Sequence, residues 1–151
     1  MSIFLPPIIH LPNTLGGKMK DIFLLNFGIE LNDSILHEIE ERSQCKVNVF
    51  NINVKINLKK NVYIQIVDLI NEVPEKYLHS KELIINVPTL SLAAIYIFCE
   101  IYFRTNRMPF ILELHRDKSK NPFAEFEFGK ICNLQLEKSV TQNNQKMREV
   151  Q

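Results

Sequence analysis

The chain has 151 residues, 46% of them hydrophobic and 23% charged, which is enough for one domain with a real core and unlike a disordered chain. Its formal net charge of +1 provides no overall field for a long nucleic acid or an anionic membrane, so any anionic ligand must be held by local donors. No stretch reaches the ~20 apolar residues of a spanning helix, and the three cysteines lack metal-ligand spacing. We therefore expect a soluble, cytoplasmic protein.

Residues 1–18 differ from the rest of the chain, because three prolines are followed by Gly16 and Gly17. The segment has no basic start, which argues against a signal peptide. We interpret it as an extension, either a flexible arm or a start assigned too early. The NTLGGK sequence at 13–18 lacks the first glycine of a phosphate loop and the hydroxyl residue after its lysine, so it is not a Walker motif.

The regular pattern begins with an apolar run at 21–27, which is typical of a strand buried on both faces. After Gly28, either Asn32 or Asp33 can cap a helix that ends near Arg42. The elements expected after that helix are a strand at 47–54, a helix at 62–73 that Pro74 ends, a strand at 82–87, a long apolar helix at 91–104, a strand at 110–115 and a last strand at 124–134.

This alternation of strands and helices predicts right-handed crossovers and a parallel sheet that is covered on both faces. We expect an α/β fold: a single Rossmann-like domain at 19–136, with a mostly parallel sheet, helices on both faces and a C-terminal antiparallel hairpin. The polar tail at 137–151 has no apolar repeat, and we expect it to be disordered.

A ligand site is expected at the carboxyl ends of the strands, where the strand order reverses in open α/β sheets. If the first and third strands are neighbours, the loop at 26–28 meets the loop at 86–91 there. The second loop opens a helix, whose free N–H groups favour phosphate, and Thr89 and Ser91 add hydroxyl donors. The alternative needs no ligand: Ser91 is a helix N-cap, Pro88 a rigid turn residue and Gly28 a turn glycine.

The remaining charged residues provide few candidates for chemistry. Glu100 and Arg104 are four residues apart and predict an ion pair, either within the helix or at a subunit interface. The four histidines show no metal-ligand spacing, so we expect neither a metal nor another cofactor. No catalytic residues can be assigned. Three further cations, which either contact phosphate or are solvated, are Arg107, Arg116 and Lys118.

Several stretches together resemble one group of small stand-alone CRISPR-associated proteins of type III loci, the member numbered fifteen of the Csx series. The stretches are LLNFGIELND, YIQIVDLINEV, LIINVPTLSLAAIYIFCEIYFRTNRMPFILEL and FEFGKICNLQ, and the resemblance spans about residues 21–136. The positions that fit the family pattern are Pro88, Leu90-Ser91, Ala93-Ala94, Glu100, Arg104, Pro109, Asn133 and Gln135. The chain departs from the pattern at Tyr102 and Phe103, where the family has His-Gly, at Met108 in place of Phe, and at Glu113 and His115 in an arginine-bearing strand.

The resemblance implies a CARF-like domain that binds cyclic oligoadenylate, the second messenger of type III CRISPR antiviral defence, with the tetra-adenylate ring as the expected ligand. It also implies self-association, as a homodimer or a ligand-bridged assembly in which the ring lies across two protomers. The candidate ligand-binding residues are Asn26, Phe27, Gly28, Asn86, Pro88, Thr89, Leu90, Ser91 and Arg104.

Three functions remain open at this point. The first is a sponge that sequesters the messenger and damps signalling without cleaving it. The second is a metal-independent ring nuclease, in which a ribose 2′-OH attacks the adjacent phosphate with help from positioning and electrostatics. The third is an adaptor whose apolar helix at 91–104 packs against a protein partner. None of the three needs a membrane or a long nucleic acid.

Overall fold

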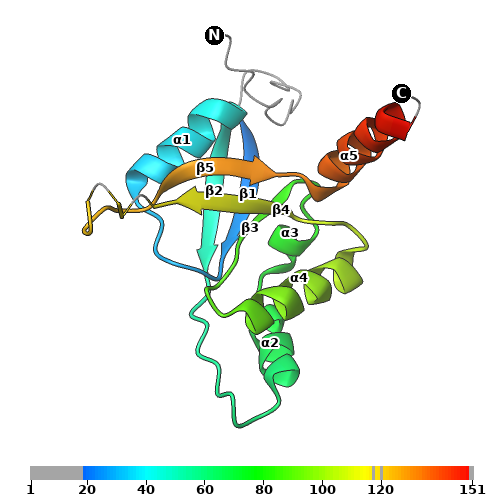
Figure 1. Ribbon diagram of the computed structural model, residues 1–151. Coiled ribbons are helices and arrows are strands. Elements are labelled where there is room, and N and C mark those ends of the chain that lie inside the picture. The colour runs from blue at the N-terminus through cyan, green and yellow to red at the C-terminus, as the bar shows by residue number, and fades with distance from the viewer. Residues whose placement is uncertain (1–18, 117, 120, 150–151) are drawn as a thin grey trace.

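The computed structural model describes residues 19–116, 118–119 and 121–149, and the expected N-terminal extension therefore lies outside the described residues. Its centre is a five-stranded sheet in the order β2-β1-β3-β4-β5 (Figure 1). The first four strands are parallel, and the last is antiparallel to its neighbour. The strands are β1 (Lys20–Asn26), β2 (Cys45–Asn51), β3 (Leu83–Asn86), β4 (Phe110–His115) and β5 (Glu127–Cys132).

Helices cover both faces of this sheet, as the sequence predicted. Side chains alternate between the two faces along a strand, so that Ile22 and Leu24 of β1 face one core and Leu25 faces the other. The first core is closed by α1, and the second by α2, α3 and α4. The helices are α1 (Asp33–Ser43), α2 (Val62–Asn71), α3 (Glu75–Leu78), α4 (Ser91–Thr105) and α5 (Leu134–Glu149). The fold is a single Rossmann-like α/β domain.

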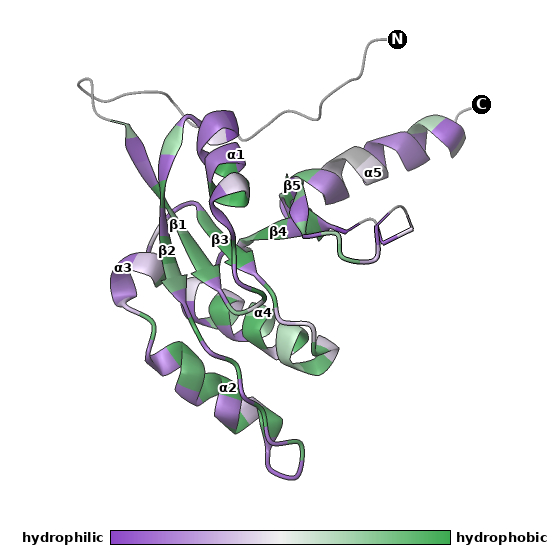
Figure 2. Ribbon diagram, turned by 90° about the vertical axis from the view of Figure 1, so that its left-hand side faces the viewer, coloured by the Kyte–Doolittle hydropathy of each residue, from purple (hydrophilic) through white to green (hydrophobic). Residues whose placement is uncertain are grey.

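The two helical layers differ in composition. Figure 2 shows α1 largely in hydrophilic colours, whereas α2 and α4 are largely hydrophobic. The edge of Tyr63 in α2 meets the ring of Tyr96 in α4, with ring centroids 5.5 Å apart, so the two helices pack directly on each other. The second core is therefore the thicker of the two, since it contains a helix pair as well as the sheet face.

Several boundaries differ from the sequence prediction: β5 covers 127–132 where 124–134 was expected, α2 ends at Asn71, and α3 was not expected. The expected strand at 47–54 covers Cys45–Asn51. The Ile52 N–H still donates to the Asn26 carbonyl at 2.8 Å, and the residues after it continue the alternation outside the sheet. The tail expected to be disordered forms α5 through Glu149, which extends away from the sheet (Figure 1). Its Gln, Glu, Lys, Met and Arg residues favour helix through intrinsic propensity, which an apolar-repeat criterion does not detect. Among the described residues, no helix has both the length and the apolar composition needed to cross a membrane.

Candidate functional site

The first and third strands are neighbours, which was the condition for the predicted site. β1 and β3 are parallel, with Asn26 level with Asn86. From β1 the chain turns to α1 on one face of the sheet, and from β3 it turns to α4 on the other face. The carboxyl ends of β1 and β3 therefore form the topological switch point, where a crevice opens in folds of this class.

Three asparagines, one from each of three adjacent strands, lie side by side at this edge. Asn51 at the end of β2 is level with Asn26, which is level with Asn86. The Asn26 Nδ2 donates to the Asn51 Oδ1 at 2.9 Å, and the Asn86 Nδ2 donates to the Asn26 Oδ1 at 2.9 Å. Sequence reasoning missed Asn51, although each of the three strands ends in an asparagine followed by a large apolar residue.

The middle asparagine has no capacity left for a ligand. Besides the two bonds above, the Asn26 Nδ2 donates to the Ile29 carbonyl at 3.0 Å, and its Oδ1 accepts from the Gly28 N–H at 3.1 Å. Two donated and two accepted bonds use up a primary amide, and Asn26 is only 4% exposed. Asn26 therefore shapes the β1–α1 loop and does not contact a ligand.

Phe27 and Gly28 are also structural parts of this loop. The Phe27 N–H donates to the Asn86 carbonyl at 2.9 Å, and its side chain is 2% exposed in the core. A Cβ on Gly28 would lie 2.6 Å from the Val87 carbonyl oxygen and 2.8 Å from the Asn86 Nδ2. Glycine is thus required because the two strand-end loops touch each other at this position, with or without a ligand.

The Oδ1 of Asn86 has no hydrogen-bond partner among the described residues. The Asn86 Nδ2 is used, and Asn86 as a whole is only 5% exposed. An acceptor that is held in place by a hydrogen-bonded partner is suited to a ligand hydroxyl or amino group.

The first turn of α4 is the most open part of the edge. Leu90, not Ser91, occupies the N-cap position, and no side chain caps the helix, so the predicted Ser91 cap is wrong. Thr89, Leu90 and Ser91 are exposed, and Pro88 is half-buried. Within the described residues, neither the Thr89 hydroxyl nor the Ser91 hydroxyl makes a hydrogen bond. Uncapped N–H groups, the positive end of the helix dipole and two free hydroxyls together favour an anion.

Arg104 lies at the other end of α4. Thirteen residues separate it from Ser91, which is about 20 Å along a helix. Its Nε donates to the Glu100 Oε1 at 2.7 Å, and the Tyr63 hydroxyl of α2 donates to the Glu100 Oε2 at 2.7 Å. Arg104 is therefore part of a contact between α2 and α4, and within one chain it is not brought to the strand-end loops.

Glu100 supplies the carboxyl group of this contact between α2 and α4, and only 7% of its surface is exposed. Burial alone would raise its pKa, but the hydrogen bonds from Tyr63 and Arg104, together with the charge of Arg104, hold the pKa below its ordinary value. The carboxylate is thus kept ionised by partners from two helices, which is a structural arrangement and not that of a general base.

A hollow lies on the α1 side of the β1–α1 loop. It consists of two parts of about 390 Å³ and about 440 Å³ that share Asn32, Glu125 and Phe126 in their walls. Ile29 and Glu30 of the strand-end loop line the larger part. Its carboxylates accept hydrogen bonds from amino groups, Arg116 lines the larger part beside them, and Phe126 offers an aromatic wall.

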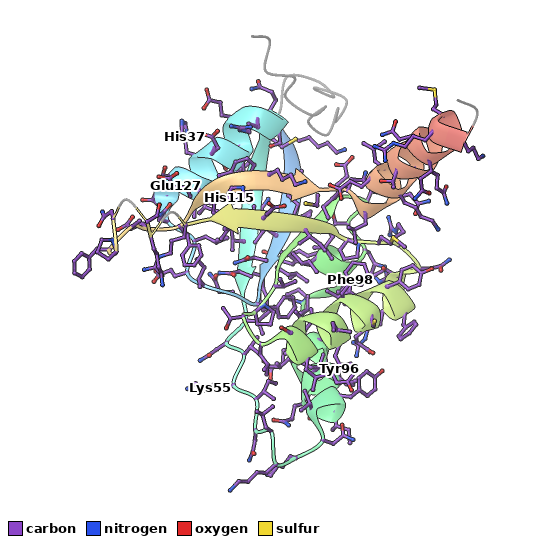
Figure 3. The ribbon with its side chains drawn as sticks, in the orientation of Figure 1. His37, Lys55, Tyr96, Phe98, His115 and Glu127 are labelled. Carbon is purple, nitrogen blue, oxygen red and sulfur yellow. The ribbon has the colours of Figure 1, made fainter. Side chains whose placement is uncertain are left out.

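The other charged candidates are engaged or lie elsewhere. The Arg107 Nη2 donates to the His79 carbonyl, and the Arg116 Nε donates to the Ala124 carbonyl at 2.7 Å. Lys118 is exposed. Lys55, which lies on the loop that follows β2, is also exposed (Figure 3). Among the described residues there is no group of His, Cys, Asp and Glu side chains that could hold a metal.

Comparisons of the chain with protein-family models, with curated proteins and with solved structures found no match.

Proposed function

We propose that the chain binds cyclic oligoadenylate, with the tetra-adenylate ring as its preferred ligand, and that it sequesters this messenger without cleaving it. The strand-end loops would hold the ring at the switch point between β1 and β3. The proposal combines the resemblance stated above with the chemistry of the α4 N-terminus, and each can be tested separately.

The uncapped first turn of α4 is the observation that carries the proposal. The first N–H groups of a helix lack partners within it, and they are satisfied by a side-chain cap, by water or by a bound group. α4 has no such cap, and the free hydroxyls of Thr89 and Ser91 flank the same turn. A phosphate is the ligand that satisfies both features, since it accepts hydrogen bonds from N–H and O–H donors and interacts favourably with the helix dipole.

The neighbouring groups support a nucleotide over a simple phosphate. The Asn86 Oδ1 can accept from a ribose hydroxyl or an adenine amino group. The hollow beside the β1–α1 loop offers carboxylates and Phe126 to a base. The near-neutral charge of the chain does not oppose this, because a compact ring needs only a local donor set.

The test mixes the full chain with cyclic tri-, tetra- and hexa-adenylate, follows binding by native gel shift and analyses the same samples by HPLC after prolonged incubation. We expect a shift with the tetra-adenylate ring and an intact ring at the end. Linear products would replace sequestration by a ring-nuclease activity. The absence of a shift with every ring would contradict the proposal as a whole.

The double variant Thr89→Ala/Ser91→Ala locates the site. Two hydrogen bonds to a charged phosphate contribute about 2–4 kcal/mol, so we expect roughly a 30- to 1,000-fold weaker affinity for the ring. Ser139→Ala is the control, because Ser139 is an exposed serine of α5 whose hydroxyl donates to the Gln135 carbonyl of its own helix, and it lines neither the strand-end loops nor the hollow. Equal affinities for the double variant and the wild type would move the ligand elsewhere.

A further inference from the structure

β2 is an end strand of the sheet, and its outer edge faces away from the other strands. Its inner edge pairs with β1 over Cys45–Asn51, and the Ile52 N–H still donates to the Asn26 carbonyl at 2.8 Å. Successive N–H groups of a strand point in opposite directions, so those of the odd-numbered residues of β2 point outward. Among the described residues, no strand lies beside this outer edge.

Side chains satisfy the outer edge at its two ends and leave its middle open. Near the start of the strand the Val47 N–H donates to the Glu40 Oε1 at 3.0 Å, and beyond the strand the Asn57 N–H donates to the Gln65 Oε1 at 2.9 Å. The N–H groups between these two points have no hydrogen-bond partner in the part of the chain that the structure describes. At ~3.3 Å per residue they span about 20 Å of chain. This open edge consists of the backbone of Val49, Asn51, Asn53 and Lys55.

The segment at 52–56 continues β2 as an extended chain on its way to α2 (Figure 1). Ile52 is buried, and Val54 and Ile56 pack against the core below α2 and α4, whereas Asn53 and Lys55 are exposed. This is the alternation of a strand that has one covered face. Side-chain packing therefore fixes the segment although no neighbour pairs with it, so an added strand would order little that is not already ordered.

The chain around the open edge is basic. Residues 44–67 contain four lysines and no acidic residue. A second copy of the chain would bring the same lysines to this edge and meet like charges, whereas a strand with acidic side chains would meet opposite ones. The extension at 1–18 contains no acidic residue, and its three prolines lack the N–H donors of a paired strand. The lysines, all of them exposed, are Lys46, Lys55, Lys59 and Lys60 (Figure 3).

We propose that the open edge of β2 binds an extended acidic segment of a partner protein, which adds a strand to the sheet. A strand edge presents N–H donors and carbonyl acceptors in alternation, and another peptide backbone matches both. The phosphates of a nucleic acid supply acceptors alone, so they would leave the carbonyl groups of the edge unmatched. This inference goes beyond the proposed ligand and does not depend on it, since the open edge includes no residue of the α4 N-terminus.

The first test is the affinity of the full chain for a synthetic peptide of alternating glutamate and valine, about as long as the open edge, measured by fluorescence anisotropy. We expect this peptide to bind. A peptide with lysine in place of glutamate should bind about tenfold more weakly or less, because its charges repel the edge. A glutamate–valine peptide with N-methyl groups on alternate residues should lose binding to a similar degree, because it cannot donate hydrogen bonds to the edge carbonyls.

Asn53→Pro tests the edge itself, and Asn53→Ala is its matched control. Both remove the same exposed side chain, but only proline removes the outward N–H, at a position where an edge strand tolerates it. We expect about tenfold weaker peptide binding in Asn53→Pro and wild-type binding in Asn53→Ala, with similar thermal unfolding of the two. Lys55→Glu should also weaken binding. Lys138→Glu changes the net charge equally on α5, which follows β5 at the opposite end of the sheet, and should not.

Hydrogen exchange of the four open-edge amides distinguishes the acidic peptide from other occupants. These amides should exchange rapidly in the free chain and become protected when the peptide is added. Protection without the peptide would show that the chain itself or a second copy covers the edge, and would overturn the proposal. The proposal would also be overturned by the absence of peptide binding, by equal binding of the lysine or N-methylated peptide, by full affinity in Asn53→Pro, or by tighter binding of a single-stranded oligonucleotide of the same length.

Discussion

α1 and α4 both begin at the carboxyl edge of the sheet, and they cover opposite faces of it. Asn32 caps α1 by accepting from the Ile35 N–H at 2.9 Å, and Asp33 adds a negative charge to its first turn. α4 has Leu90 at the same position, with no cap and no acidic residue in its first turn. The two N-termini thus differ in whether a further anion would be attracted.

The outer faces of the two helices differ in the same way. α1 presents Asp33, His37 and Glu41 to water, whereas α4 presents Leu92 and Ile95. α1 satisfies its own N-terminus through Asn32 and presents polar side chains to water. α4 does neither, and for this reason the proposed phosphate site is placed at α4.

An ion pair at the same spacing occurs in both helices, which allows a direct comparison. The Arg42 Nε donates to the Glu38 Oε1 at 2.6 Å in α1, and the Arg104 Nε donates to the Glu100 Oε1 at 2.7 Å in α4. The Glu38 side chain is 37% exposed and that of Glu100 is 9% exposed. The second pair has a hydrogen-bonded third partner, Tyr63 of the neighbouring helix, whereas the Arg42 guanidinium of the first pair lies over the Phe128 ring, 4.9 Å from its centroid.

The largest expected effect in this comparison comes from Glu100→Ala. The variant leaves Arg104 and the Tyr63 hydroxyl without their shared acceptor and removes a buried link between α2 and α4, so we expect a loss of about 1–3 kcal/mol of unfolding free energy. Glu38→Ala, at an exposed pair, should cost about 0.3–0.5 kcal/mol. Urea unfolding of both variants measures the difference, and equal losses would show that burial of the α4 pair contributes nothing.

Substitutions at the N-caps of α1 and α4 should have the next largest effect on the free energy of unfolding. Asn32→Ala should destabilise the domain by about 1 kcal/mol, because it removes the only side-chain acceptor at the start of α1. Leu90→Asp should have the opposite sign, since it supplies a cap and a negative charge that α4 lacks. Thermal unfolding measures both.

Leu90→Asp also sharpens the proposed function. A carboxylate at this position would occupy the first-turn N–H groups of α4 and repel phosphate, so the variant should be more stable and yet bind the tetra-adenylate ring more weakly. Leu90→Asn adds the cap without the charge and serves as its control. Full affinity in Leu90→Asp would argue against phosphate at this turn.

The sequence was sufficient for the fold because the local signals agree with one another. The buried strand at 21–27, the cap at Asn32 or Asp33, of which the structure uses Asn32, and the break at Pro74 each predict an element boundary by a separate physical rule. The structure differs where these sequence rules do not apply. The alternation of apolar and polar residues continues past Asn51, although β2 ends there. α5 forms although its sequence has no apolar repeat. Pairing depends on the neighbouring strand, which no single segment encodes.

The meeting of the two strand-end loops could be predicted from the sequence, but the contacts of their side chains could not. Topology predicted that the loops after β1 and β3 meet, and they do. Whether an asparagine faces a ligand or its neighbour depends on side-chain geometry across three strands, so the hydrogen bonds of Asn26 to Asn51 and Asn86 could not be foreseen. Arg104 fits a sequence pattern, yet its place along α4 separates it from the loops.

The smallest predicted effect is the pH dependence of the α4 pair. The hydrogen bonds and charge that surround Glu100 hold its pKa below the ordinary value of 4.5, so its folded form binds a proton less readily than its unfolded form does. The stabilisation is therefore complete above pH 4.5 and is lost as the pH falls through the folded pKa. Urea unfolding of the wild type and of Glu100→Gln over this range should give a constant difference at neutral pH that shrinks in acid. The difference in unfolding free energy shrinks because a protonated Glu100 and a glutamine offer Arg104 similar uncharged acceptors. If this difference did not change with pH, the ionised carboxylate would add no stability between α2 and α4.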